Sequence, residues 1–260
     1  MKSWVLLVAA VLTSLTCTTS STAQITEYVT VDGVQRRYVV HLPSGHDGSE
    51  SLPVLYHFHG GGSTPEGEVN FIDFRPLTNS ENFIAVYPAG LPSPGEPAPG
   101  WNTLGPYDNG NDDLGFVEAM IDAMVKEYNA DPERMYACGF SWGGNFQFEL
   151  YCYLSERMAA VVSVAAGMWD WTYDACNPST PTGAMSIHGT SDSYNPYNGN
   201  AYNISFTQLN TFLVQENGAT TPHLKKPLAT ARTMSGPRVK TASRSSMFGS
   251  RVAATYGHHS

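Results

Sequence analysis

The chain has 260 residues, of which 42% are hydrophobic and 14% charged, and this suffices for one globular domain with a large buried core. Its 12% aromatic content excludes a disordered acidic chain. The net charge of -9 argues against nucleic acid as the main partner, because an acidic surface repels phosphate.

The N-terminus has the features of a secretory signal peptide. Lys2 precedes an apolar run, Trp4–Leu12, and Ser21-Thr22-Ala23 offers small residues for cleavage. The run is far shorter than the ~20 residues of a membrane-spanning helix, and no later segment reaches that length, so no membrane association is expected. We predict a signal peptide over residues 1–23 and a secreted mature chain that begins near Gln24.

Beyond the leader, short apolar runs alternate with amphipathic runs, which predicts an α/β fold with a mostly parallel sheet covered by helices. One helix is expected to begin at Asp112 or Asp113, where a carboxylate caps the N-terminus, and to bury residues 116–125. Two more follow Gly143 and Ser205. The expected strands are Arg37–Leu42, Val54–His59, Phe83–Tyr87, Met135–Phe140, Ala160–Ala165 and Ala184–His188.

A glycine run follows the second of these strands. His59 precedes Gly60-Gly61-Gly62, and a strand that ends in His-Gly-Gly-Gly is typical of the oxyanion loop of lipases and esterases. The expected donor is the N–H of Gly61, and a flexible glycine turn is the alternative. His57 and His59 form a His-x-His pair, but no third ligand cluster stands nearby in sequence, so no metal site is expected.

The strongest motif is Gly139-Phe140-Ser141-Trp142-Gly143, between an apolar strand and an apolar helix. This is the context of a nucleophile elbow, in which a serine hydroxyl stands exposed on a strained turn. Glycines two residues away on both sides let the strand and the helix approach each other. We therefore predict Ser141 as the nucleophile and the N–H of Trp142 as a second oxyanion donor, in a reaction that needs no cofactor.

Three further predictions concern the residues around this motif. Asp192 follows the last expected strand and is the predicted acid, since a triad on this fold has the order Ser, Asp, His. Cys138 lies in a strand pattern, so we expect Cys152 and Cys176, which flank loops, to form a disulfide in an oxidising compartment. Aromatic side chains are expected either to line a substrate pocket or to fill the core: Trp101, Trp169 and Trp171.

The end of the chain differs in composition from the rest. After Glu216 there is no Asp or Glu, and no apolar period continues beyond Gly218. We therefore predict a hydrolase domain over residues 24–218 and an aberrant basic tail over residues 219–260, disordered or derived from a shifted reading frame.

Together these residues resemble the secreted esterase family that includes polyhydroxybutyrate depolymerases, feruloyl esterases and acetyl xylan esterases of carbohydrate esterase family one. The likeness spans about Tyr38 to Gly199. It rests on these segments: Tyr38–Pro43, His59–Gly61, Phe83–Pro88, Trp101, Asp112–Phe116, Asp131–Tyr136, Ser141, His188–Asp192 and Pro196-Tyr197.

The resemblance implies an α/β-hydrolase three-layer sandwich, with Ser141 as nucleophile and Asp192 as acid. Family members carry the base in a Gly-Gly-Gly-His segment followed by Trp-Pro, which this chain lacks. The nearest counterpart is Tyr256-Gly257-His258-His259-Ser260, so His258 is the expected base.

The implied function is hydrolysis of feruloyl or acetyl esters of plant polysaccharide, or of a polyester. Two alternatives stay open: a catalytically impaired relative that binds glycan, and a serine peptidase on the same fold.

Overall fold

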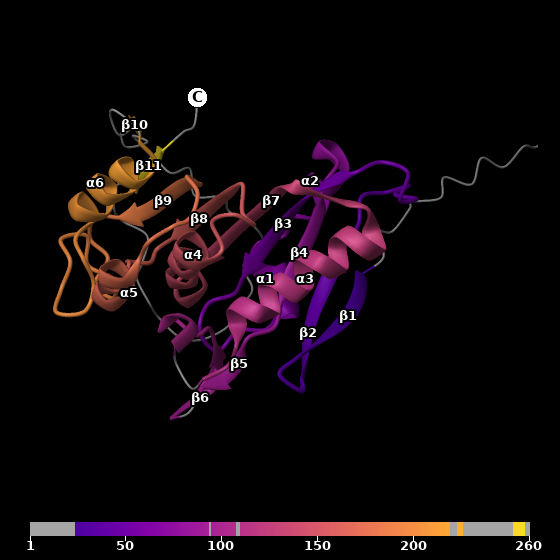
Figure 1. Cartoon of the computed structure of the whole chain (residues 1–260), viewed down its shortest axis with the longest axis horizontal. Coiled ribbons are helices and arrows are strands. Elements are labelled where there is room, and N and C mark those ends of the chain that lie inside the picture. The colour runs from indigo at the N-terminus through magenta and orange to yellow at the C-terminus, as the bar shows by residue number, and fades with distance from the viewer. Residues whose placement is uncertain (1–23, 94, 108–109, 219–222, 226–251, 258–260) are drawn as a thin grey trace, which may run out of the picture.

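A computed structural model describes residues 24–93, 95–107, 110–218, 223–225 and 252–257 of the chain. Its centre is a nine-stranded sheet of order β1-β2-β4-β3-β7-β8-β9-β11-β10, with β1 and β10 at opposite ends (Figure 1). The five strands from β4 to β9 run parallel, and the outer two at each end run antiparallel to their neighbours. The strands are β1 Gln24–Val31, β2 Val34–His41, β3 Leu52–Phe58, β4 Ile84–Pro88, β7 Ala130–Phe140, β8 Ala160–Val164, β9 Gly183–Gly189, β10 His223–Lys225 and β11 Val252–Gly257.

Helices cover the two faces of this sheet unequally. α3 (Asp113–Tyr128) packs on β1 and β7, α4 (Trp142–Tyr153) packs on β3, β7 and β8, and α6 (Phe206–Glu216) lies against β11. On the opposite face, α1 (Pro65–Phe71) and α2 (Arg75–Glu81) lie against β4. A short helix α5 (Asp170–Ala175) follows β8, and β5 (Leu91–Ser93) and β6 (Glu96–Gly100) form a separate hairpin. The predicted three-layer α/β sandwich is confirmed.

The expected cap of α3 is present. The side chain of Asp112 accepts a hydrogen bond from the N–H of Gly115, and the helix ends at Asn129 in the left-handed conformation. The apolar stripe between them is fully buried against the sheet: Phe116, Val117, Met120, Ile121 and Met124. Sequence periodicity did not reveal α1 and α2, since seven residues are too few to show a helical period.

The sheet continues beyond Gly218, where the sequence predicted the domain to end. β11 inserts between β9 and β10, pairing Val252 with Gly189 and Gly257 with Ala184. Two short segments of the predicted tail, β10 and β11, therefore pair in the sheet. Backbone hydrogen bonds hold an added strand without an apolar period, so the composition of this segment gave no signal of it. Among the described residues, no helix is both long and apolar enough to cross a bilayer.

Candidate active site

Ser141 lies at a sharp turn between β7 and α4. Its backbone adopts φ 53° and ψ -119°, a conformation that residues other than glycine rarely adopt. Its N–H donates to the carbonyl of Val164 on β8 at 2.9 Å. A Cβ on Gly139 would clash with the carbonyl of Gly143, and one on Gly143 with the carbonyl of Phe58. Only glycine fits on either side, so the local geometry is that of a nucleophile elbow.

The glycine run after β3 forms a tight turn beside this elbow. The N–H of Ser63 donates to the carbonyl of Gly60 at 3.2 Å, and Gly62, at φ +77°, donates to Pro99 at 2.7 Å. A Cβ added to Gly60 would lie 3.6 Å from the Cβ of Ser141. Within the described part of the chain, the N–H groups of Gly61 and Trp142 have no partner. The two predicted oxyanion donors therefore remain available for a ligand.

His59 anchors the first residue of this turn. Gly90 donates its N–H to His59 Nε2 at 2.9 Å, so the proton lies on Nδ1, which donates to the carbonyl of Gly60 at 2.7 Å. Burial lowers the pKa of His59, which keeps the ring neutral. Sequence reasoning had weighed this histidine as a metal ligand or a motif residue. In the structure it holds the glycine turn through the carbonyl of Gly60.

The indole of Trp142 lies between two backbone segments. A Cβ on Gly61 would come within 2.9 Å of this ring, as would one on Gly100 at the end of β6. Because both neighbours lack a side chain, the ring packs directly on the glycine turn and on the β5–β6 hairpin. Only the backbone of Trp142 had been expected to matter, and the motif gave no sign of this second role.

Asp192 follows β9 at the edge of the sheet where β7 delivers Ser141, since the two strands run parallel. Its Oδ1 accepts the N–H groups of Tyr194 at 2.8 Å and Asn195 at 2.9 Å. Its Oδ2 lies 3.9 Å from Nε2 of His188. One carboxylate oxygen thus holds a local turn, and the other could accept a hydrogen bond from a group outside this loop.

No described histidine hydrogen-bonds to Ser141. His188 is buried, its Nε2 donates to the carbonyl of Asn195 at 2.6 Å, and burial lowers its pKa. His258, the expected base, lies outside the described residues. Gly257, which precedes it, pairs with Ala184 at the start of β9, whereas Ser141 and Asp192 follow the ends of β7 and β9. Ala184 and Gly189, the last residue of β9, are about 17 Å apart at 3.3 Å per residue.

The three tryptophans divide into two groups. Trp101 is 1% exposed, stacks on Phe146 and donates Nε1 to the carbonyl of His59 at 2.8 Å. Its assignment to a substrate surface is wrong, because its ring fills the core. Trp169 and Trp171 stack with ring centroids 5.0 Å apart, and Trp171 is 40% exposed.

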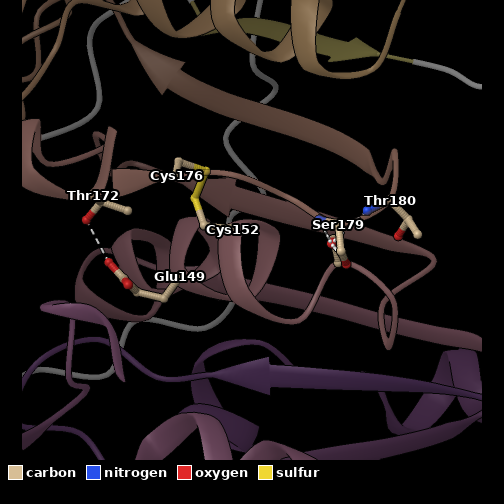
Figure 2. The surroundings of a disulfide bond; sticks show 7 residues. Glu149, Cys152, Thr172, Cys176, Ser179 and Thr180 are labelled. Carbon is tan, nitrogen blue, oxygen red and sulfur yellow. Dashed lines mark hydrogen bonds between the residues drawn. A yellow bond between two sulfur atoms is a disulfide. The ribbon is translucent and has the colours of Figure 1, made fainter. Parts of the chain in front are cut away.

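Two links join the helix that carries Trp171 to α4. Figure 2 shows the disulfide between Cys152 of α4 and Cys176 at the end of α5. Beside it, Thr172 donates its hydroxyl to buried Glu149 at 2.6 Å. Burial raises the pKa of Glu149 to about 7. Trp171 is also fixed by its Nε1, which donates to the carbonyl of Thr103 at 2.8 Å.

Cys138 is buried and forms no disulfide. Over the described ranges, no group of three or more His, Cys, Asp or Glu side chains is arranged to hold a metal ion.

No family model matches the chain. It is similar to a bifunctional acetylxylan esterase/xylanase of Neocallimastix patriciarum, with 29% identity over 65% of this chain, and to feruloyl esterase B of Piromyces equi, with 29% identity over 70%. It spans only 23% and 34% of the length of these two proteins. Feruloyl esterase C of Emericella nidulans is 28% identical over 74% of this chain and 66% of its own length.

Among solved structures, a thermostable esterase superimposes with a TM-score of 0.53 and 18% identity, over 75% of this chain and 52% of that protein. The chain has the α/β-hydrolase fold. In this α/β-hydrolase fold, the elbow and the glycine loop lie together at the carboxyl edge of the parallel strands, where open α/β sheets bind ligands.

Proposed function

We propose that the chain is a secreted serine carboxylic ester hydrolase that cleaves feruloyl or acetyl esters of plant polysaccharide. The observation that carries this proposal is the strained Ser141 backbone beside two N–H groups without a described partner, those of Gly61 and Trp142. The names of the three sequence relatives supply the substrate class. The disulfide agrees with secretion, because such bonds persist in oxidising compartments.

In the proposed mechanism, Ser141 Oγ attacks the ester carbonyl carbon while a histidine accepts the hydroxyl proton. The carbonyl oxygen becomes an oxyanion held by the N–H groups of Gly61 and Trp142, each worth about 2.7 to 4 kcal/mol of transition-state stabilisation. The proton passes to the departing alcohol, and an acyl-Ser141 intermediate remains. Water, deprotonated by the same histidine, then releases the acid.

The substrate surface is proposed to include the stacked Trp169 and Trp171. A planar indole held in place by a hydrogen bond suits either a phenolic ring or the apolar face of a sugar, and the exposed part of Trp171 is available for such contact. The same residues would serve a polyester only if its chain reached this aromatic pair.

A fluorophosphonate probe tests the nucleophile in the full chain. We expect labelling of the wild type, none of Ser141→Ala, and hydrolysis of a p-nitrophenyl ester without cleavage of peptide anilides. Anilide cleavage at a comparable rate would instead identify a peptidase. Feruloyl and acetyl esters of xylan oligomers, compared with polyhydroxybutyrate film, then decide the substrate class.

A second candidate function follows from the placement of Gly257, at the opposite edge of the sheet from Ser141. A chain without a base in reach would keep only about 10³ to 10⁴-fold catalysis over water and would act as a glycan-binding relative. Absent labelling, together with retention on insoluble xylan, favours this candidate. Equal labelling of wild type, His258→Ala and His259→Ala shows that neither histidine is the base.

A further inference from the structure

A buried polar chain lies beneath the oxyanion loop, and neither the elbow nor the predicted triad uses it. His57 of β3 lies between Cys138 of β7, with 3.1 Å from Nδ1 to Sγ, and Glu68 of α1, with 2.8 Å from Nε2 to Oε1. His57 and Glu68 are only 2% and 3% exposed. Two consecutive elements, β3 and α1, and the distant strand β7 therefore meet through these hydrogen bonds.

The positions of the protons along this chain follow from its chemistry. Burial raises the pKa of the Cys138 thiol to about 12, so the sulfur keeps its proton and donates to Nδ1 of His57. Nδ1 of His57 is then an acceptor, so Nε2 carries the ring N–H proton and donates to Glu68. The second oxygen of Glu68 accepts the hydroxyl of Ser63 at 3.3 Å. Each of the four groups thus has a partner, as buried polar groups require.

Ser63 is the residue at which this chain reaches the site. It closes the turn that starts at Gly60, and its side chain is bonded to the first helix after that turn. His59 fixes the opposite end through the carbonyl of Gly60. Gly61 lies between the two fixed ends, and its N–H has no partner among the described residues.

We propose that Ser63 and Glu68 are positioning residues of the oxyanion hole. Glu68 is anchored by His57, which is itself bonded to Cys138, and Glu68 in turn fixes Ser63. Ser63 then holds the N–H of Gly61 toward Ser141. This inference rests on the proposed ester hydrolysis for its kinetic consequence. Its structural content, an ordered Gly61 amide, does not depend on catalysis.

The decisive variant is Ser63→Ala, in a half-buried loop position where loss of one hydroxyl leaves the core intact. Full loss of an oxyanion donor lowers kcat by about 10² to 10³-fold, so a loosened donor is expected to lower it about tenfold on a p-nitrophenyl ester, with KM unchanged. Ser63→Thr keeps the hydroxyl and is expected to restore kcat. Ser80→Ala, which removes an exposed hydroxyl on α2, is the matched control.

A second readout is the order parameter of the Gly61 amide, measured by relaxation on the full chain labelled with ¹⁵N-glycine. We expect it to fall in Ser63→Ala and to stay at the wild-type value in Ser63→Thr and Ser80→Ala. An unchanged Gly61 amide in Ser63→Ala overturns the proposal, and so does a kcat equal to that of the wild type. If the wild type hydrolyses esters no faster than Ser141→Ala, the proposed function fails. The order parameter of the Gly61 amide then tests this inference by itself.

Discussion

The two sides of Ser141 are built differently. On the oxyanion side, the turn from Gly60 to Ser63 is fixed at both ends by buried groups, His59 and Glu68, and it packs directly on the elbow. On the acid side, Asp192 is held by two N–H groups of its own loop, and its second oxygen has only a 3.9 Å contact with His188.

This difference shows which half of the site the fold preorganises. Donors that stabilise an oxyanion must be in place before charge develops, and the turn proposed to supply them is held by buried groups around it. A carboxylate that orients a base needs the base itself to complete its hydrogen bonds. In the proposed mechanism, the described residues therefore supply the oxyanion side, whereas the acid side still requires a base.

The largest effect is expected on the acid side. Asp192→Asn keeps the Oδ1 acceptor of the loop but removes the charge that stabilises an imidazolium, so kcat is expected to fall by about 10³ to 10⁴-fold in steady-state ester hydrolysis. Asp174→Asn, at an exposed position of α5, is the control. Equal kcat values for the two variants would show that Asp192 only shapes its loop.

On the oxyanion side, Gly61→Ala tests how tightly the loop is packed. The new methyl would meet the Trp142 ring at 2.9 Å, which displaces one donor, and kcat is expected to fall by about 10² to 10³-fold with little change in KM. The double variant Gly61→Ala with Trp142→Leu makes room for the methyl and is expected to regain part of this loss. A single variant with wild-type kcat would contradict the role of the loop.

The contrast between the two sides also explains what the sequence predicted. Gly139 is required by a clash with the backbone of Gly143, close to Ser141 in sequence, and a motif records such a local constraint, whereas Gly143 is required by the backbone of Phe58 on β3. The positions of six strands of the central sheet likewise followed from apolar runs of typical length. The polar contacts of Glu68 were not foreseen, because they join α1 to β3 and only the tertiary structure brings these elements together.

The tryptophans show the same limit. Composition places Trp101 and Trp171 in one aromatic class, but one fills the core beside Phe146 and the other is partly exposed on α5. The direction of β11 decides which edge of the sheet a base after this strand reaches, and no residue pattern in the basic tail indicates that direction. The roles of Ser141, Asp192 and His258 remain predictions.

The disulfide is expected to brace the acid side, where α5 carries the tryptophan pair. Replacing Cys152 and Cys176 together by Ser frees a loop with a sequence separation of 24 residues, so the free energy of unfolding is expected to fall by about 3 kcal/mol in urea denaturation. Cys138→Ser alone, as a second buried site, separates loss of the cross-link from loss of a thiol. An unchanged midpoint in the double variant would assign the bracing to Thr172 and Glu149 instead.

The smallest expected effect is a pH dependence from Glu149. Its pKa of about 7 in the fold lies above its ordinary value, so the folded state binds more protons than the unfolded chain between about pH 4.5 and 7. This contribution to stability is fully present below that window and is lost as the pH rises through it, by no more than about 3 kcal/mol. Urea denaturation of Glu149→Gln should show a flatter dependence over the same window. In Glu149→Gln the side-chain oxygen can still accept from Thr172, so the variant removes only the titration. Parallel pH profiles of the two proteins would therefore contradict the prediction. They would mean that Glu149 stays charged in the fold.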